Sequence, residues 1–263
     1  MIGLFLGEKK LPLEILKSLK KKKIKYFIID LSKNNKFKKD KNSYFINIGK
    51  FGKILELIKS KKCNKVLFAG NIIKPRISKL KLDLKGFYYI PRVIKASKLG
   101  DAAILKELIN ILSENKIKVI KLNTYNPELT ITKGCYTKAK PSVIDKLTIK
   151  KGIQILNKSN SYNHVQALVI NNQKVVSLEK RKGTKDMLKS IRNNNLQNKL
   201  LLKMPKSKQD LRVDLPTIGL DTLKDCKKAN IKGIVLKANQ NIFLDKYEGL
   251  KFANKNSIFV IAK

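Results

Sequence analysis

Short apolar runs alternate with amphipathic segments of helical length along the first half of the chain. Five apolar runs have the length of buried strands: Ile2–Leu6, Lys25–Leu31, Tyr44–Ile48, Val66–Ala69 and Lys118–Leu122. Three segments repeat apolar residues at helical spacing: Leu11–Lys22, Gly52–Lys61 and Ala102–Asn115. This alternation predicts a mostly parallel, Rossmann-like sheet with helices packed on it. The loops that follow such strands face the binding crevice.

The segment Asn123–Pro141 interrupts this rhythm with two prolines and a glycine, and it predicts a domain boundary. A second α/β unit follows. Its predicted helices are Val143–Asn157, Thr184–Asn194 and Asp221–Ala229; its predicted strands are Val165–Ile170, Val175–Leu178, Leu200–Lys203, Ile234–Leu236, Ile242–Leu244 and Ile258–Ile261. The sequence therefore predicts an α/β protein of two domains. Residues 1–130 form a Rossmann-like parallel sheet with helices, and residues 131–263 form a mixed-sheet α/β domain.

Composition argues for a folded protein with a strong excess of positive charge. Of the 263 residues 43% are apolar, which supports a core, and the formal net charge is +40. Five of the 59 basic residues are arginine and the other 54 are lysine, spread over nearly every segment. A nucleic-acid site would instead gather its basic residues on one stripe, so no specific nucleic acid is expected as a partner. Against this lysine bias, the arginines are the better phosphate-binding candidates, because a guanidinium binds phosphate with a planar fork.

Cysteine usage and hydropathy indicate a cytoplasmic protein. Cys63, Cys135 and Cys226 lie far apart without C-x-x-C spacing, so neither a disulfide framework nor a zinc site is predicted. No apolar stretch reaches the roughly 20 residues that span a bilayer. Met1–Gly7 lacks the basic region and the cleavage site of a signal peptide, and we expect it to be a buried strand.

The densest polar segment of the chain is Lys203–Gly219. If this segment is extended, Asp210, Arg212 and Asp214 share one face, because side chains alternate along a strand. Two carboxylates beside an arginine could bind a divalent cation and a phosphate together, since Mg²⁺ takes oxygen ligands and shares its shell with substrate phosphates. The helix that follows could add its N-terminus as a phosphate site. A charged surface loop with local salt bridges explains the same residues equally well.

The run KMPKSKQDLRVDLPTIGLDT, at Lys203–Thr222, resembles the signature of the UDP-2,3-diacylglucosamine pyrophosphatases of the LpxI type. Supporting matches span nearly the whole chain: Gly3, Leu11-Pro12, Ala69-Gly70, Lys74-Pro75, Gly100-Asp101-Ala102, Pro127-Glu128-Leu129, Gln166-Ala167, Glu179, Gly183-Thr184 and Met187-Leu188. The resemblance implies an enzyme of lipid A biosynthesis. It would use Mg²⁺ (or Mn²⁺) to hydrolyse the pyrophosphate bond of UDP-2,3-diacylglucosamine, directing water at the phosphorus on the sugar side. The products are UMP and 2,3-diacylglucosamine 1-phosphate (lipid X).

The same resemblance implies roles for individual residues. Asp214 is the expected essential carboxylate, as metal ligand or base, with Asp210 and Arg212 as further catalytic residues. The implied metal ligands are Asp214, Asp210, Glu179 and Asp221. The implied substrate-binding residues are Lys203, Lys206, Gln209, Thr217, Gly219, Gly7, Gly70, Arg76, Asp101, Gln166, Gly183 and Thr184. The substrate would lie between the two domains with its acyl chains enclosed by apolar surface, for which the aromatic run Phe87–Ile90 is a candidate; core packing is the alternative for that run.

Three departures from the family pattern leave alternatives open. The glycine-rich turn after the first strand is Gly7-Glu-Lys-Lys here, D-x-G-Q-A appears as Asn163-His-Val-Gln-Ala, and E-G-T-D appears as Lys182-Gly-Thr-Lys. Lysines could contact the phosphates directly in place of the lost acids. Alternatively, the chain is a non-catalytic relative that binds nucleotide-sugar lipid, or, as a weaker alternative, a basic nucleic-acid-binding protein. Peripheral contact with the cytoplasmic face of the inner membrane and a homodimer are both compatible with the sequence.

Overall fold

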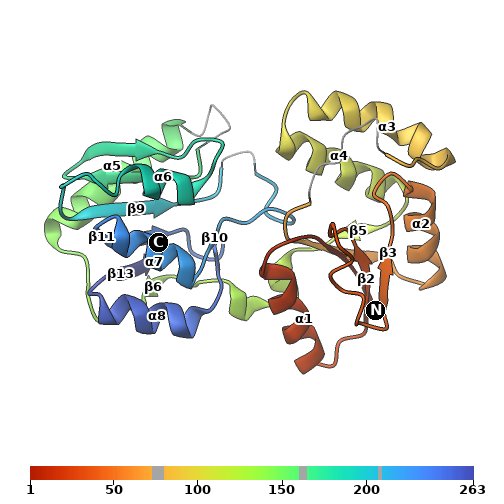
Figure 1. Ribbon diagram of the computed structural model, residues 1–263, viewed down its shortest axis with the longest axis horizontal. Coiled ribbons are helices and arrows are strands. Elements are labelled where there is room, and N and C mark those ends of the chain that lie inside the picture. The colour runs from red at the N-terminus through yellow and green to blue at the C-terminus, as the bar shows by residue number, and fades with distance from the viewer. Residues whose placement is uncertain (73–79, 160–164, 207–208) are drawn as a thin grey trace. The chain divides into compact units, whose positions relative to one another are not determined.

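The computed structural model describes residues 1–72, 80–159, 165–206 and 209–263 (Figure 1). The chain forms two compact units. The first comprises Met1–Pro127 together with Arg212–Asp214, and the second comprises Glu128–Leu211 and Leu215–Lys263. The first unit contains a parallel sheet and the second a mixed sheet, so the predicted two-domain α/β class is confirmed.

The first unit is built on five parallel strands in the order β3-β2-β1-β4-β5. The strands are β1 (Ile2–Leu6), β2 (Tyr26–Asp30), β3 (Ser43–Phe45), β4 (Lys65–Ala69) and β5 (Lys118–Val119). All five residues of the central strand β1 are buried, because helices cover both faces of the sheet. This is why β1, β2 and β4 are mostly apolar runs in the sequence, and they were predicted within a few residues of their observed ends.

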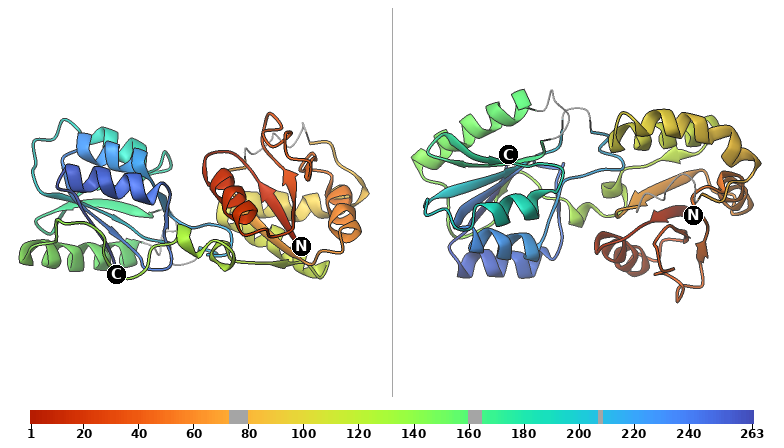
Figure 2. Two further views of the ribbon diagram at one scale, coloured as in Figure 1. Left: turned by 90° about the horizontal axis from the view of Figure 1, so that it is seen from below. Right: turned by 45° about the horizontal axis from the view of Figure 1, so that its top comes forward.

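Four helices cover the first sheet: α1 (Leu11–Lys21), α2 (Phe51–Ser60), α3 (Leu84–Ser97) and α4 (Asp101–Glu114). Phe5, Phe27 and Phe68 point to one face and form a core with residues of α2, α3 and α4. Helix α1 lies on the other face (Figures 1 and 2). Two short 3₁₀ turns, Leu122–Thr124 and Pro127–Leu129, lead out of the unit.

Helix α3 was not predicted from the sequence, because Gly86 and Pro91 interrupt its pattern. Its start is fixed by Asp83, whose carboxylate accepts from the backbone N–H of Gly86 (2.8 Å). The same carboxylate accepts from Gly52 (3.1 Å) and Lys53 (3.0 Å) at the N-terminus of α2. One side chain therefore caps two helices. Burial opposes ionisation of Asp83, but these backbone N–H donors hold its pKa below the usual 3.8.

We expect Asp83→Ala to lower the free energy of unfolding by about 2 kcal/mol at neutral pH, since a typical cap contributes about 1 kcal/mol and two helices lose theirs. The folded-state pKa lies below the unfolded value, so this contribution is complete above pH 3.8 and is lost as the pH falls through the folded pKa. Urea unfolding of both proteins over a pH series measures it. The exposed Glu56→Gln on α2 serves as the control. A stability difference for Asp83→Ala that persists unchanged in acid would contradict the capping role of the ionised carboxylate.

The second unit contains a six-stranded mixed sheet in the order β6-β13-β11-β9-β7-β8. Strands β9 (Lys199–Lys203), β11 (Ile231–Leu236) and β13 (Phe259–Ala262) are parallel, whereas β6 (Gly134–Cys135), β7 (Ala167–Asn171) and β8 (Lys174–Leu178) run antiparallel to their neighbours. A separate two-stranded ladder joins β10 (Thr217–Ile218) to β12 (Ile242–Phe243).

Helices cover both faces of this sheet as well. Helix α5 (Val143–Ser159) lies on one face, and α6 (Thr184–Ser190), α7 (Leu220–Lys228) and α8 (Lys246–Lys255) lie on the other (Figure 2). Helix α8 and strand β10 were not predicted. None of the helices in the described part of the chain is long and apolar enough to cross a membrane.

Candidate active site

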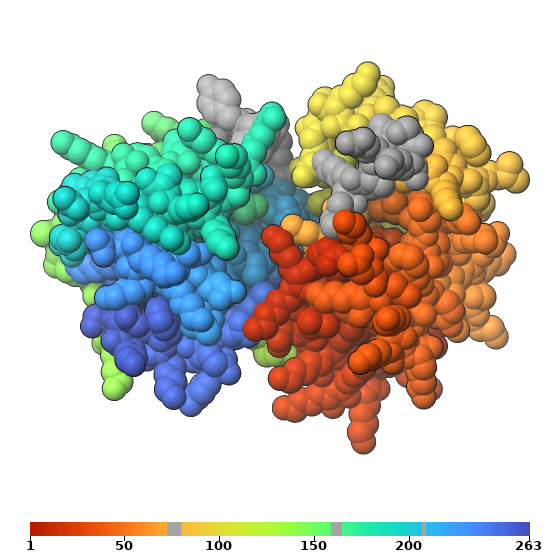
Figure 3. Space-filling model, in the orientation of Figure 1, coloured from red at the N-terminus to blue at the C-terminus, as the bar shows by residue number. Residues whose placement is uncertain are grey.

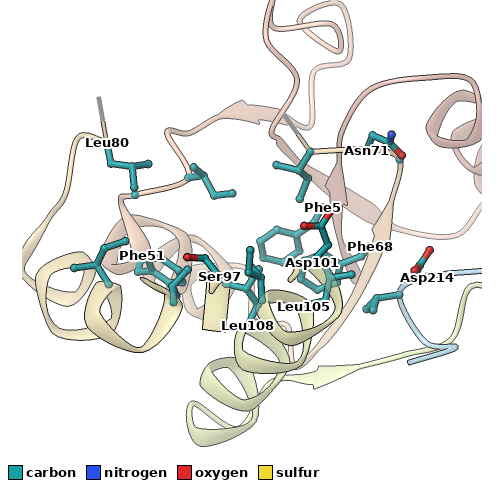
Figure 4. A pocket seen from close by; sticks show the side chains of 18 of the residues that line it. Phe5, Phe51, Phe68, Asn71, Leu80, Ser97, Asp101, Leu105, Leu108 and Asp214 are labelled. Atoms are coloured by element: carbon teal, nitrogen blue, oxygen red, sulfur yellow. The ribbon is translucent and has the colours of Figure 1, made fainter. Parts of the chain in front are cut away.

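A cavity of about 370 Å³ lies at the carboxyl end of the first sheet (Figure 4). Its floor contains Phe5 and Phe68, whose rings stack 4.5 Å apart, and its walls include Leu105 and Leu108 from α4. Polar groups are few: they include Asn71 after β4, Asp101 in the first turn of α4, and Asp214. An apolar cavity with a small number of polar groups is the usual form of a small-molecule site, and its place outside the strand ends is the usual place in an α/β sheet.

The loops at this edge depend on two glycines. The N–H of Gly7 donates to the carbonyl of Ala69 (2.9 Å), and an added Cβ on Gly7 would come within 2.3 Å of the carbonyl oxygen of Asn71. Gly70 has a φ of +84°, and a Cβ there would lie 2.4 Å from the carbonyl oxygen of Glu8. Side chains are therefore excluded where the loops after β1 and β4 cross. Of the two predicted glycines, Gly70 lines the cavity, and Gly7 holds the neighbouring loop.

Val213 and Asp214, in the middle of the motif Lys203–Gly219, line this cavity. Arg212–Asp214 belong to the first unit, where Val213 packs against the core formed with α2, α3 and α4. Asp214 lines the cavity beside these walls. Leu211–Val213 form a turn, so the prediction that Asp210, Arg212 and Asp214 share one face of an extended chain is wrong. A turn breaks the alternation of side chains on which that prediction rested.

A buried polar network connects four predicted residues in the second unit. The ammonium of Lys203, at the end of β9, donates to Thr184 Oγ1 (2.7 Å), and Thr184 Oγ1 donates to Glu179 Oε1 (2.5 Å). The other carboxylate oxygen of Glu179 accepts from the backbone N–H of Gln166 (3.2 Å). Lys203, Thr184 and Glu179 are all buried. The hydroxyl thus bridges a buried cation and a buried anion, each of which offsets the desolvation of the other.

A second cavity of about 370 Å³ lies at the carboxyl ends of β9, β11 and β13. It is lined by Lys206 and Gln209 of the motif, and by Lys237 and Lys263. Gln209 Oε1 accepts from the backbone N–H of Lys206 (2.9 Å) and from Nε2 of Gln166 (3.3 Å). Within the described residues, the buried Nε2 of Gln209 has no hydrogen-bond partner. Three lysines therefore line this cavity, which suits an anionic ligand.

The other predicted residues lie at element ends. Thr217 Oγ1 donates to the carbonyl of Leu215 (3.1 Å), and the N–H of Gly219 donates to Thr222 Oγ1 (3.3 Å) at the start of α7. Asp221 is exposed in the first turn of α7. Gly183, with a φ of +85°, is the N-cap of α6. Arg76 lies outside the described residues.

Two of the other arginines are held by acidic side chains rather than placed for phosphate. Arg92 on α3 bonds Glu107 and Glu114 of α4, at 2.6 Å each. Arg192 bonds Asp225 of α7 at 2.7 Å. The first pairs join α3 to α4, and the second joins the segment after α6 to α7. The prediction that the scarce arginines bind phosphate therefore does not apply to Arg92 and Arg192.

The four carboxylates of the predicted metal set are divided between the units. Asp214 belongs to the first, and Asp210, Glu179 and Asp221 belong to the second. Within the described part of each unit, no three acidic, histidine or cysteine side chains are gathered as a metal-binding group. The first cavity does contain two carboxylates, Asp101 and Asp214 (Figure 4). Hard oxygen donors of this kind suit Mg²⁺, which is often held by one or two carboxylates together with substrate phosphates.

Some residues that line the first cavity were not identified from the sequence. Val93 and Ile94 line the cavity from α3, which was not predicted, and they share one helix face with Ile90, which belongs to the run considered above as an acyl-chain wall. The residues of the aromatic run Phe87–Ile90 differ in their surroundings. Ile90 lines the cavity and Tyr89 is buried in the core, whereas Phe87 and Tyr88 are exposed, so the run as a whole does not line an acyl cavity.

The fold and the cavity define a two-domain α/β protein with a Rossmann-like first domain and a largely apolar pocket that carries two carboxylates. The family model described as the LpxI N-terminal domain matches residues 1–129, and the LpxI C-terminal domain matches residues 132–261. The chain belongs to the LpxI family. It is 28% identical over 224 residues to the UDP-2,3-diacylglucosamine pyrophosphatase LpxI of Caulobacter vibrioides, covering 82% of this chain and 80% of that protein.

Proposed function

We propose that this chain hydrolyses the pyrophosphate bond of UDP-2,3-diacylglucosamine in the cytoplasm, giving UMP and 2,3-diacylglucosamine 1-phosphate for lipid A biosynthesis. Its family places it among the hydrolases that cleave a phosphoanhydride. The observation that carries the proposal is the position of Asp214. The carboxylate of the family motif lines a cavity whose other walls are mostly apolar, and a diacylated substrate needs both kinds of surface.

In the proposed reaction, water attacks the phosphorus on the sugar side. The new P–O bond forms as the bond from that phosphorus to the bridging oxygen breaks, and UMP leaves with the bridging oxygen. Asp214 accepts the proton of the water or orients it. Asp101 lies in the first turn of α4, where it completes a pair of carboxylates at the cavity.

Mg²⁺ or Mn²⁺ is the proposed cofactor, with Asp214 and Asp101 as its protein ligands in the first unit. When bound, the ion would neutralise charge on the diphosphate oxygens and polarise the reacting phosphorus. Asp210, Glu179 and Asp221 remain predicted ligands. For Glu179 the partners described above, Thr184 and the N–H of Gln166, favour a supporting role, in which it fixes Lys203.

The second unit has a candidate anion-binding site of its own, formed by lysines and an amide. Lys206 and Gln209 line the cavity at the ends of β9, β11 and β13, where Lys237 and Lys263 add positive charge. Charge stabilisation by fixed cations supplies much of the acceleration in phosphoryl transfer.

The test is hydrolysis of UDP-2,3-diacylglucosamine by the purified chain in ¹⁸O-labelled water, with and without Mg²⁺. We expect Mg²⁺-dependent release of UMP, with the label in the 2,3-diacylglucosamine 1-phosphate. Label in UMP would place the attack on the other phosphorus. Tight binding of the substrate without turnover would overturn the proposal in favour of a non-catalytic relative, which the lost acids at Lys182 and Lys185 make the second candidate.

A further inference from the structure

Helix α3 of the first unit has two apolar faces, and only one of them is covered. Its inner face supplies Ile90, Val93 and Ile94 to the wall of the cavity. On the outer face Leu84, Phe87 and Tyr88 are 90%, 65% and 71% exposed. A helix of a globular protein usually buries a single apolar stripe and presents polar residues on the opposite side. The second, exposed stripe of α3 therefore indicates an interaction surface.

The exposed residues form one continuous stripe. Leu84, Phe87, Tyr88 and Pro91 follow the spacing i, i+3, i+4 and i+7, which places them on the same side of a helix, and all four are exposed. Figure 3 shows α3 and α4, in gold and yellow, at the surface of the first unit. The stripe is therefore a surface feature.

The lysines around this stripe suit an anionic partner. Lys95 and Lys98 continue the same side of α3 toward its C-terminus, and Lys81 and Lys85 flank its beginning; all four are exposed. Aromatic and aliphatic side chains bordered by lysines are typical of a helix that lies in the interface of an anionic bilayer. Each lysine near such a surface adds about 1 kcal/mol of attraction.

We propose that the outer face of α3, formed by Leu84, Phe87, Tyr88 and Pro91, docks on an anionic lipid bilayer. The proposal rests on the proposed function for its meaning: the helix that touches the bilayer is the one that lines the cavity, so a lipid substrate leaving the membrane has a short path to it. The occupant of the face is the lipid surface itself, with its anionic head groups at the lysines and its acyl region at the apolar stripe.

The chain contains no tryptophan, which permits a site-specific test. In Phe87→Trp the single indole reports on α3, and in Ile144→Trp it reports on α5, where Val143, Ile144 and Leu147 form another exposed apolar group beside Lys146. Vesicles of phosphatidylglycerol and phosphatidylethanolamine are added to each protein. We expect the emission of Phe87→Trp to shift to shorter wavelength and to be quenched by brominated acyl chains, and the emission of Ile144→Trp to stay unchanged. No shift in Phe87→Trp, or a shift only in Ile144→Trp, overturns the proposal.

A second measurement separates docking from the general attraction of a chain with a net charge of +40. In about 1 M salt, where the Debye length is about 3 Å, nonspecific charge attraction is screened. We expect Phe87→Ser/Tyr88→Ser to lose at least about tenfold in vesicle partitioning under these conditions, because two aromatic side chains no longer enter the bilayer. The matched Ile144→Ser/Leu147→Ser variant should partition like the unmodified chain. Equal partitioning of both variants contradicts the proposal.

Measurements of hydrolysis separate the docking proposal from the proposed function. Phe87→Ser/Tyr88→Ser should hydrolyse substrate in detergent micelles at the normal rate and substrate in vesicles more slowly. Vesicle binding is measured without any turnover, so it tests the docking face even if no hydrolysis is found.

Discussion

Asp214→Asn should abolish nearly all hydrolysis of UDP-2,3-diacylglucosamine while leaving the fold intact. The substitution keeps the shape of the side chain and removes its charge and basicity at the cavity of the first unit. We expect kcat to fall at least about 100-fold, the lower end of what a positioned acid or base contributes. Loss of a metal ligand would add to this. The rate of UMP release at saturating substrate and Mg²⁺ is the measurement.

Two further variants test whether the loss of hydrolysis in Asp214→Asn is specific to the cavity and to the metal. The exposed carboxylate of Glu248, on α8, is converted to the amide in Glu248→Gln, which should retain the full rate. Asp101→Asn should raise the Mg²⁺ concentration that gives half-maximal rate, because one of the two cavity carboxylates no longer attracts the ion. Full activity of Asp214→Asn would remove the catalytic assignment, and an unaltered Mg²⁺ requirement in Asp101→Asn would remove Asp101 from the metal site.

Lys203→Met should destabilise the second unit by about 3 kcal/mol. The buried ammonium of Lys203 is linked to Glu179 through the hydroxyl of Thr184, and its removal takes this cation away from the buried carboxylate. Removing one member of a buried ion pair costs about 3 to 5 kcal/mol. Urea unfolding monitored by circular dichroism measures the change. Lys227→Met, at an exposed position of α7, should stay within about 0.5 kcal/mol of the unmodified chain.

The double variant Lys203→Met/Glu179→Gln gives the sharper test of this network. With both charges removed, no uncompensated charge remains buried, so the double variant should be more stable than Lys203→Met alone. Additive losses would show that the two charges do not interact. In that case Lys203 would be better explained by a contact with substrate, and its effect would be confined to turnover.

Much of the scaffold was predictable from local pattern. In both units the central strands are buried on both faces, so their residues form short apolar runs, and β1 (Ile2–Leu6) was predicted with its observed bounds. Helix α3 was missed because Gly86 and Pro91 interrupt its pattern, and its cap, Asp83, also accepts from the N–H of Gly52, 31 residues away in sequence. No window of local sequence contains both partners of such a contact.

What the sequence by itself determined is the alternation of strands and helices, the presence of two α/β units, and the motif that carries Asp214. These depend on the local period of apolar residues and on neighbouring residue types. Only the tertiary structure decided that the motif turns at Leu211–Val213, that Val213 anchors it to the core of the first unit, and that Thr184 joins Lys203 to Glu179. Packing between distant segments fixes these contacts, because burial there forces polar groups to find partners that the local sequence does not specify.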